Sequence, residues 1–363
     1  MVIIEAAWVH RRVGVRATLT LCVSLLLGGL ASFATAAEPG AQPKAFALWL
    51  VDIREQAIAQ GISAATVDAA FVGVEPDQRV LRADSRQPEF VQTFEQYLQG
   101  RVTPARAKAA RVHYKENQAL LERIAERYQI DAPYLIAFWA LESNFGRLQG
   151  NFSIIRSLAT LAHDQRRSAF FTRELMAALQ VLDEGHVPLD EFVGGWAGAM
   201  GQNQFMPSSF LNFAQDFDGD GKKNIWSNTA DVWASIAYYL SENKWQAGES
   251  WGMSVSIAEP VEFSKLMPMS VAPGCRALRH HTRPLSLVDW SAKGIVPAVE
   301  QAVEQAADPR VSVRKYAMVV PQPGETVGYL VGKNFRTILS YNCANKYAVS
   351  IGLLADMIVA DSD

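Results

Sequence analysis

The amino-acid sequence predicts a mainly α protein with some α+β character, in which a small β lobe occupies part of the C-terminal third. Apolar residues recur at helical spacing from Ala45 to about Glu191, and one segment within this stretch is apolar on nearly every side. After Trp251 the pattern changes to short β-rich runs between prolines and glycines. With 363 residues, 49% of them hydrophobic, the chain is long enough for two or three lobes around a large core.

The first 37 residues predict a signal peptide that is not part of the fold. Arg11, Arg12 and Arg16 precede an uncharged run over residues 17–37, which closes on the small-x-small pattern Ala34-Thr35-Ala36. A retained membrane anchor is less favoured, because the strongly apolar part is short for a span and contains two adjacent glycines. We therefore expect an exported, periplasmic protein.

The three cysteines bear on membrane attachment and on covalent structure. Cys22 follows Leu21, whereas a lipidated cysteine prefers a small residue before it, so an outer-membrane lipoprotein is the less favoured prediction. The cleaved chain keeps Cys275 and Cys343 in an oxidising compartment, where a disulfide persists. The sequence leaves open whether these two cysteines form a bridge or stay as free buried thiols.

Residues 38–118 predict a helical N-terminal lobe, which is followed by a core over residues 119–250. Residues 38–44 contain two prolines and a glycine and indicate a linker, and Phe90 and Phe94 are helically spaced together with Leu98. The core opens with a further helical pattern of apolar residues, namely Leu120, Leu121, Ile124, Ala125 and Tyr128.

The segment Ala132–Glu142 predicts a buried helix, because its large apolar side chains surround the helix axis on nearly every side. Asp131 is expected to cap its N-terminus, and Pro133 is tolerated in the first turn. Asn144 and Gly146 supply the residues that end a helix.

Glu142 closes this apolar helix and is the candidate catalytic residue. Glutamate is rarely buried without a partner, and both burial and the negative end of the helix dipole favour its protonated form. A carboxyl group that stays protonated near neutral pH is what a general acid for glycosidic cleavage requires. The alternatives are a glutamate paired with Arg147, or one turned outward at the helix end.

A glycine-rich stretch over residues 194–209 predicts compact turns that carry the neutral amides Gln202-Asn203-Gln204. Glycines let the backbone approach a ligand closely, and amides bind hydroxyl and acetamido groups without adding a charge. Such a loop suits a sugar, but the loop taken in isolation favours a tight turn with solvated amides. Ser208 or Ser209 is expected to cap the helix that follows.

An acidic loop predicts a structural calcium site. Three aspartates at alternating positions precede a glycine, as at the start of a calcium-binding loop. Position twelve is Ser227 in place of the usual glutamate, so a later aspartate is expected to close the site. The predicted ligands are four carboxylates and one backbone carbonyl: Asp216, Asp218, Asp220, Asp231 and Lys222. The alternative is an acidic turn that binds no metal tightly. No cofactor is expected to be required for chemistry.

The remaining sequence predicts short elements and no further site. These elements are a helix over 231–240, β-rich runs over 254–257 and 327–339, and a helix over 347–360. The β lobe is therefore expected over residues 251–340, with a C-terminal segment over 341–363. Arg279-His280-His281 lacks a third metal ligand at useful spacing and is expected at the surface. The formal net charge of −3 and the absence of a basic tract argue against a nucleic-acid partner.

Taken in order, these motifs resemble those of the lytic murein transglycosylase B family. The resemblance covers residues 45–358, which is nearly the whole chain after the predicted signal peptide. The resembling segments are Ala140-Leu141-Glu142-Ser143-Asn144-Phe145-Gly146, Ser157-Leu158-Ala159-Thr160-Leu161, Arg166-Arg167-Ser168-Ala169-Phe170-Phe171, Gly198-Ala199-Met200-Gly201, Gln204-Phe205-Met206-Pro207-Ser208-Ser209, the Asp216 loop with Asn224-Ile225-Trp226, Tyr341-Asn342, and Tyr347.

The resemblance implies a lysozyme-like catalytic domain over residues 119–250, flanked by the helical and β lobes, with residues 341–363 completing the catalytic groove. It implies cleavage of the β-1,4 bond between N-acetylmuramic acid and N-acetylglucosamine in peptidoglycan, leaving a 1,6-anhydromuramoyl end. The expected partners are peptidoglycan glycan strands, with cell-wall synthesis or remodelling proteins as further candidates.

The family motif assigns the catalytic role to Glu142, which acts first as an acid and then as a base. Family positions around the sugar sites match Gln204, Tyr341, Asn342 and Tyr347, and Arg167 matches an arginine of the groove. Asn203 is a further expected substrate contact. The family often has a small residue where Asn203 stands, so the chain departs from the pattern there. Family members with this acidic loop can bind calcium near the active site.

Two other functions stay open at this point. An ordinary peptidoglycan hydrolase (muramidase) needs a second carboxylate about 5 to 9.5 Å from the acid, and Asp164 and Glu174 are the candidates. A non-catalytic peptidoglycan-binding protein that keeps the fold is the alternative from a different class. The products separate the first alternative, because a hydrolase leaves reducing muramoyl ends in place of anhydro ends. Glu142→Gln separates the second, because only an enzyme loses cleavage while it keeps binding.

Overall fold

A computed structural model describes residues 45–85, 92–164, 166–258, 261–270, 274–298, 311, 314–322 and 325–360. The predicted signal peptide, the linker over 38–44 and Phe90 lie outside these residues. Within the described ranges, no helix combines the length and the apolar character that crossing a membrane requires.

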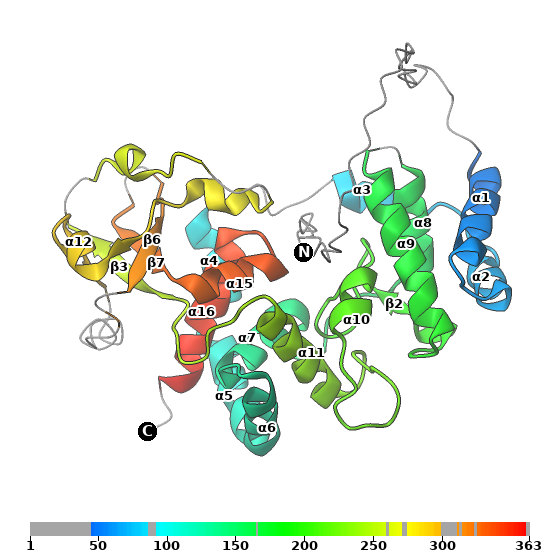
Figure 1. Cartoon of the computed structure of the whole chain (residues 1–363), viewed down its shortest axis with the longest axis horizontal. Coiled ribbons are helices and arrows are strands. Elements are labelled where there is room, and N and C mark those ends of the chain that lie inside the picture. Colours follow the sequence, from blue (N-terminus) through cyan, green and yellow to red (C-terminus); the bar gives the residue numbers. More distant parts are fainter. Residues whose placement is uncertain are drawn as a thin grey trace, which may run out of the picture.

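Helices make up most of the described chain, and the strands are short (Figure 1). The helices are α1 Phe46–Ala59, α2 Ala64–Phe71, α3 Gln78–Ser85, α4 Phe94–Arg101, α5 Pro104–Glu116, α6 Gln118–Tyr128, α7 Ala132–Ser143, α8 Ile154–His163, α9 Ser168–Asp183, α10 Pro207–Phe213, α11 Thr229–Glu242, α12 Leu287–Ser291, α15 Lys333–Tyr341 and α16 Asn345–Val359. The 3₁₀ turns are η2 Leu189–Glu191, η3 Phe263–Leu266 and η4 Arg276–His280. The strands are β1 Phe152–Ser153, β2 Val193–Gly194, β3 Gly252–Ile257, β4 Leu285–Ser286, β5 Ile295–Pro297, β6 Lys315–Val319 and β7 Val327–Val331. The predicted class, mainly α with a small β lobe, is confirmed.

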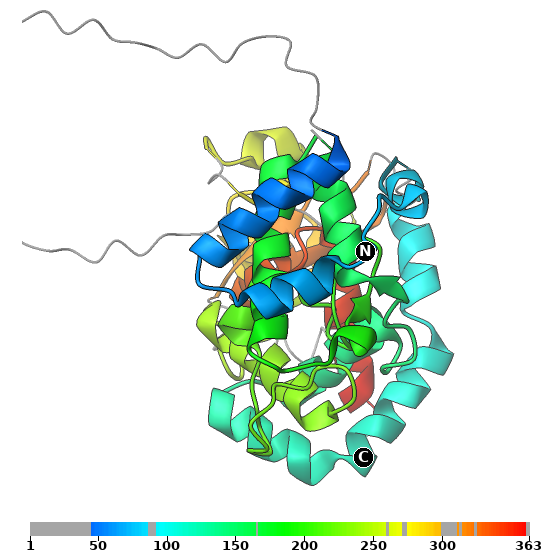
Figure 2. The same cartoon turned by 90° about the vertical axis from the view of Figure 1, so that its right-hand side faces the viewer.

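One group of helices forms the end of the molecule opposite the β lobe. Helices α8 and α9 pack side by side, and α1, α2 and α3 pack against them (Figures 1 and 2). Ser63 caps α2, and its hydroxyl donates to Asp183 at the end of α9 over 2.5 Å. The first three helices are therefore held by a helix pair that follows them by about a hundred residues.

A second group surrounds α7 in the middle of the molecule, and α7 is buried on nearly every side, as predicted. Helices α5, α6, α11 and α16 contact it, and α4 contacts α16. The helices of the predicted N-terminal lobe over 38–118 thus divide between two packing groups, because α1–α3 contact α8 and α9 instead. The domain boundaries themselves stay a prediction.

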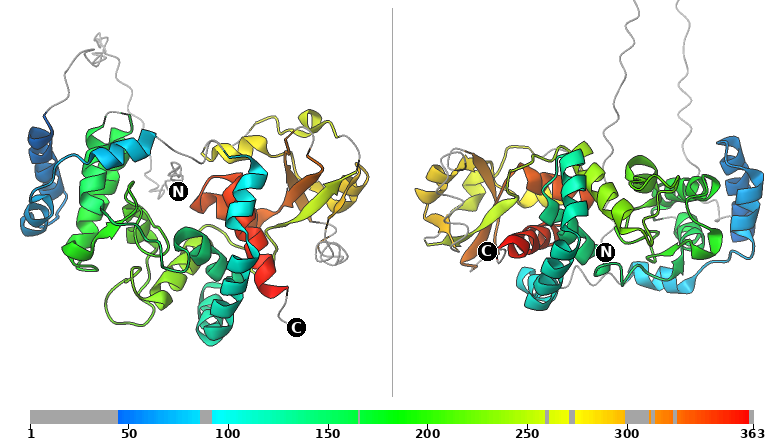
Figure 3. Two further views of the ribbon diagram at one scale, coloured as in Figure 1. Left: turned by 180° about the vertical axis from the view of Figure 1, so that it is seen from behind. Right: turned by 90° about the horizontal axis from the view of Figure 1, so that it is seen from below.

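The β lobe is a five-stranded antiparallel sheet with the strand order β4-β6-β7-β3-β5. It lies at the far end from α1 and α2 (Figure 3) and has its own small core, in which Met253, Trp290 and Met318 are buried. The β-rich run predicted over 327–339 is wrong in its second half, because β7 ends at Val331 and α15 begins at Lys333. Buried Asn334 explains the helix, since its side chain bonds the backbone of residues 246 and 249.

Two predictions about helix caps are corrected by tertiary contacts. Ser208 and Ser209 do not cap α10, which begins at Pro207 with Met206 as its cap residue. Ser208 instead donates its backbone N–H and its hydroxyl to Glu174 of α9. Asp131 stands at the cap position of α7 but makes no capping bond, because its carboxylate accepts hydrogen bonds from Trp245 and Gly248.

The predicted surface position of Arg279-His280-His281 is wrong for its last residue. His281 is buried, and its Nε2 lies 2.8 Å from the Asn345 side-chain oxygen at the start of α16. A disulfide between Cys275 and Cys343 lies beside this contact and closes a loop with a sequence separation of 68. The β-lobe segment around η4 is therefore attached to the turn between α15 and α16.

Asp356 of α16 predicts a pH-dependent stability. The Trp251 indole donates to its carboxylate over 2.9 Å, and burial raises the pKa of Asp356 to about 6. In the unfolded chain the same carboxyl group has a pKa near 4. The free energy of unfolding therefore falls as the pH rises from about 4 to about 6. We expect Asp356→Asn to be more stable than the wild type by about 2 kcal/mol at pH 7 and equally stable at pH 4, in urea unfolding. Asp190→Asn on exposed η2 is the control, and a stability difference that does not change with pH would contradict this account.

Candidate functional site

The end of α7 is an unusual backbone turn that presents Glu142. Asn144, Phe145 and Gly146 follow the helix with φ angles of 49°, 60° and 78°. A left-handed conformation is uncommon for a bulky residue, so Phe145 is strained unless its surroundings hold it. The ring of Phe145 packs against Trp139 and against His113 of α5, with ring centroids 5.4 and 4.7 Å away. The helix predicted to stop at Asn144 and Gly146 does so.

A buried amide connects this turn to the glycine-rich loop. Gln202 accepts a hydrogen bond from the Trp139 indole over 2.7 Å and donates to the Trp226 carbonyl over 2.9 Å. A Cβ atom at Gly146 would lie 2.5 Å from the Gln202 amide oxygen, so the motif needs glycine where that amide crosses the turn. The Gln202 side chain thus makes its hydrogen bonds within the protein, whereas the sequence had suggested that the amides of this stretch face a sugar.

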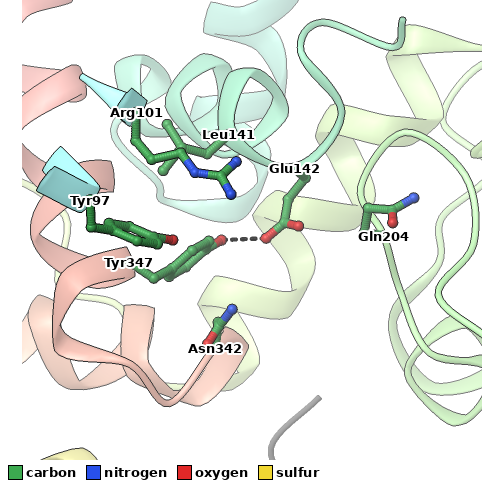
Figure 4. Close-up of a pocket in the computed structure, with 7 residues that line it drawn as sticks. All are labelled: Tyr97, Arg101, Leu141, Glu142, Gln204, Asn342 and Tyr347. Atoms are coloured by element: carbon green, nitrogen blue, oxygen red, sulfur yellow. Dashed lines mark hydrogen bonds between the residues drawn. The ribbon is translucent and has the colours of Figure 1, made fainter. Parts of the chain in front are cut away.

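A pocket opens where α7, α4, the glycine-rich loop and the start of α16 meet. Figure 4 shows Glu142 entering from α7 between Tyr347 on one side and Gln204 on the other. The lining residues are Tyr97 and Arg101 of α4, Leu141 and Glu142 of α7, Gln204, Asn342 and Tyr347. Glu142 is the one carboxylate in this lining, and the remaining side chains apart from Arg101 are neutral.

Glu142 is held by a hydrogen bond from the C-terminal helix. The Tyr347 hydroxyl donates to Glu142 Oε1 over 2.5 Å. Burial and the nearby Glu142 charge raise the pKa of Tyr347 well above its ordinary value, so the phenol keeps its proton at neutral pH and remains a donor. This hydrogen bond fixes one carboxylate oxygen of Glu142 where the side chain lines the pocket.

The other predicted sugar-binding residues differ in where they lie. Gln204 lines the pocket, and its amide nitrogen donates to the carbonyls of residues 149 and 201. Asn342 also lines it, and within the described chain its buried Oδ1 has no hydrogen-bond partner. Tyr341 and Asn203 are not among the lining residues, and the Tyr341 hydroxyl donates to the Asn203 carbonyl over 2.5 Å. Both side-chain polar atoms of fully buried Asn203 lack partners among the described residues.

Arg167 lies outside the set of residues that line the pocket. It precedes α9, pairs with Asp84 at the end of α3, and lies with its guanidinium 4.9 Å from the Phe171 ring centroid. Arg166 pairs with the same Asp84 and with Asp164. These ion pairs attach α3 to the start of α9, and the predicted groove contact of Arg167 stays a prediction.

The two candidates for a second catalytic carboxylate are both engaged elsewhere. Asp164 pairs with Arg166 over 3.0 Å, and neither belongs to the pocket lining. Glu174 is buried against α10, where it accepts two hydrogen bonds from Ser208. The pocket therefore holds a single acid, as a one-glutamate mechanism requires.

Tyr97 and Arg101 are pocket residues that the sequence analysis missed. They lie one turn apart on α4, a helix in which only the apolar spacing of Phe94 and Leu98 drew notice. No motif marks them, since α4 reaches the pocket only by packing against α16, far along the chain. The one available signal was a tyrosine and an arginine at four-residue spacing on a short helix.

The acidic loop brings three of the predicted metal ligands together. Carboxylate oxygens of Asp216, Asp218 and Asp231 all lie within 4.8 Å of one another. Asp220 lies outside this cluster, and its carboxylate accepts the Lys222 N–H over 2.8 Å. The cluster consists of oxygen donors alone, which is the donor set that calcium prefers.

Asp231 is the buried member of this cluster, and its surroundings show whether the residues suit a cation. It is fully buried, and its two oxygens accept the backbone N–H groups of Phe217 and Asn224. Burial raises the pKa of Asp231 to about 6, and the neighbouring charges of Asp218 and Asp216 add to the shift. A divalent cation among these carboxylates offsets the repulsion, so the residues fit calcium.

Fold and pocket together are of the lysozyme-like type, with one acid placed at the end of a buried helix. Residues 45–356 match the family described as "Transglycosylase SLT domain", and the chain belongs to this family. The predicted resemblance to lytic murein transglycosylases is confirmed at the level of the family.

Individual relatives agree with this assignment. The membrane-bound lytic murein transglycosylase B of Escherichia coli (strain K12) is 28% identical over 260 residues, which cover 71% of this chain and 65% of that protein. The matched part is thus less than two thirds of that relative's length. SltB3 of Pseudomonas aeruginosa, solved in complex with NAG-anhNAM-pentapeptide, is 37% identical with a TM-score of 0.75, covering 87% of this chain and 80% of that one. Slt35 of Escherichia coli, solved in complex with calcium, is 23% identical with a TM-score of 0.67, covering 85% of this chain and 92% of that one, a likeness of fold alone.

Proposed function

We propose that this protein is a lytic murein transglycosylase, which cleaves the MurNAc-β-1,4-GlcNAc bond of peptidoglycan and leaves 1,6-anhydromuramoyl ends. The observation that carries the proposal is Glu142, the one carboxylate in a pocket whose other polar groups suit a sugar. The name of the Escherichia coli relative and the peptidoglycan fragments in the SltB3 complexes support it.

Glu142 performs both proton transfers in this proposal. Its carboxyl group gives its proton to the glycosidic oxygen as the bond to the anomeric carbon breaks, while the Tyr347 hydroxyl bonded to Oε1 holds the group in place. The ionised Glu142 then takes the proton of the muramoyl C6 hydroxyl, whose oxygen attacks the anomeric carbon and closes the anhydro ring. The acetamido group of the substrate stabilises the developing positive charge, so no second carboxylate is required.

Neutral side chains orient the sugars around the acid. The amide nitrogen of Gln204 is already bonded to backbone carbonyls, which leaves its oxygen to accept from the substrate. Asn342 offers a buried amide oxygen in the same lining. Tyr341 and Asn203 support this lining, and Arg167 extends the contact along the strand beyond the pocket.

Product analysis tests the proposal directly. Purified sacculi are digested with the protein, and the released muropeptides are analysed by mass spectrometry. Anhydromuramoyl ends are the expected result, because the C6 hydroxyl and not water attacks. Reducing muramoyl ends would show a hydrolase, and no release of soluble muropeptides would show a binding protein without activity.

Tyr347→Phe is expected to lower kcat by about 10- to 100-fold. The variant removes a hydrogen bond to a charged group, which is worth about 1.5 to 3 kcal/mol, while the ring stays in place. Rates of muropeptide release measure the effect, with Tyr114→Phe on α5 as a control outside the pocket lining. Equal rates for Tyr347→Phe and wild type would remove Tyr347 from the mechanism.

We further propose that the acidic loop binds calcium and stabilises the fold. Calcium that binds only the native state raises the melting temperature in proportion to the logarithm of its concentration, and EDTA reverses the change. The rise should be lost in Asp231→Ala and should weaken below about pH 6, where Asp231 holds a proton. Thermal unfolding in calcium, in magnesium and in EDTA measures this; identical curves in all three would exclude the site.

The proposed activity is compatible with export to the periplasm, where peptidoglycan lies. Its partners are then glycan strands and, as further candidates, proteins that synthesise or remodel the cell wall. Fractionation of cells that produce the protein tests the location: the mature protein is expected in the periplasmic fraction with an N-terminus near residue 37 or 38.

A further inference from the structure

Arg101 is the positive charge in a pocket that is otherwise neutral apart from Glu142. It stands in the last turn of α4, and its guanidinium carbon lies 5.4 Å from the ring centroid of Tyr97, one turn earlier. Figure 4 shows the Arg101 side chain extending from the α4 wall toward the space in front of Glu142. The charge is thus held on an aromatic face beside the acid.

The chemistry of the lining indicates what this charge meets. Tyrosine, asparagine and glutamine side chains suffice for the hydroxyl and acetamido groups of a neutral sugar. A guanidinium adds a planar set of N–H donors that matches the two oxygens of a carboxylate. The Tyr97 ring lies beside this guanidinium and restricts where it can move. A cation in the last turn also stabilises a helix, but that role needs no extension into a pocket.

We infer that Arg101 binds a carboxylate on the lactyl arm of the muramoyl residue and so distinguishes peptidoglycan from neutral β-1,4 glycans. This inference rests on the proposed function. The carboxylate belongs either to the lactyl group itself, in strands without peptides, or to the stem peptide attached to that group. N-acetylglucosamine carries neither, and Arg101 gains nothing from a strand composed of it alone.

Binding to an inactive protein tests the inference without cleavage. Calorimetry on Glu142→Gln uses three probes: chitotetraose, a peptide-free GlcNAc-MurNAc tetrasaccharide, and the same tetrasaccharide with stem peptides. Adding Arg101→Gln should weaken binding of a carboxylate-bearing probe by at least about tenfold and leave chitotetraose unchanged within twofold. Loss confined to the peptide-free probe assigns the lactyl carboxylate, and loss confined to the other probe assigns the stem.

Three results would overturn the inference: equal loss for chitotetraose, no loss for any probe, or no binding of any probe by Glu142→Gln. Failure of the proposed function is seen separately, as absence of muropeptide release by the wild type. Arg101→Lys serves as the second variant, because it keeps the charge without the planar donors and should lie between wild type and Arg101→Gln. Arg127→Gln is the matched control, since Arg127 lies 5.4 Å from the Tyr128 ring centroid but on α6, outside the pocket lining.

Discussion

Replacement of Glu142 by glutamine is expected to lower cleavage of peptidoglycan by at least about a thousand-fold. General acid–base catalysis contributes about 10²- to 10⁴-fold, and here one residue supplies both the acid and the base. The glutamine side chain has the same shape and still accepts the Tyr347 hydrogen bond through its oxygen. Folding and sugar binding should therefore be kept, which calorimetry with the peptidoglycan tetrasaccharide and thermal unfolding can measure.

Asp164→Asn is the control for this experiment. Asp164 is a carboxylate close in sequence to the site, but it pairs with Arg166 and does not line the pocket. Its substitution should leave the rate of muropeptide release near that of the wild type. A loss in Asp164→Asn as large as that in Glu142→Gln would indicate two catalytic carboxylates, and with them a hydrolase.

Removal of the Cys275–Cys343 disulfide is expected to cost about 4 kcal/mol of unfolding free energy. The bond closes a loop with a sequence separation of 68, and restriction of the unfolded chain by a loop of this length accounts for that magnitude. Urea unfolding of the Cys275→Ser, Cys343→Ser double variant, beside the oxidised wild type, measures the difference.

The same double variant should also have reduced activity under conditions in which it is still folded. Cys343 follows pocket residue Asn342 directly and precedes Tyr347 by four residues, so the bridge holds the segment that bonds Glu142. Wild type treated with a reductant provides the control, because it should resemble the double variant. Unchanged stability in both would show that the hydrogen bonds around His281 and Asn345 suffice.

The parts of the site that could be predicted are those encoded by neighbouring residues. The burial of α7, its end at Asn144 and the place of Glu142 follow from one short segment, because a helix that is apolar on all sides has to be enclosed. The acidic loop could be predicted in the same way, because the carboxylates of Asp216 and Asp218 come from neighbouring positions and lie close together. The place of Asp231 in the cluster was harder to predict, because only the fold brings it close to Asp216 and Asp218.

The parts that could not be predicted depend on distant partners. Residues 332–339 have a β-rich composition, yet Asn334 docks on the backbone of residues 246 and 249 and a helix forms. Serine is a residue type that often caps a helix, but the carboxylate of Glu174 accepts the backbone N–H of Ser208 in the first turn of α10. Tyr97 carries no local signal beyond its four-residue spacing to Arg101, because its position in the pocket depends on contact between α4 and α16.

The hydrogen bond between Tyr347 and Glu142 joins residues that are 205 positions apart. A contact of such separation costs loop-closure entropy, which packing of the chain between its two ends has to offset. A growing chain that has not yet added α16 contains the whole of α7 with Glu142 and still lacks the Tyr347 side of the pocket. The environment of Glu142 is therefore complete only once α16 has been made and has packed against α7.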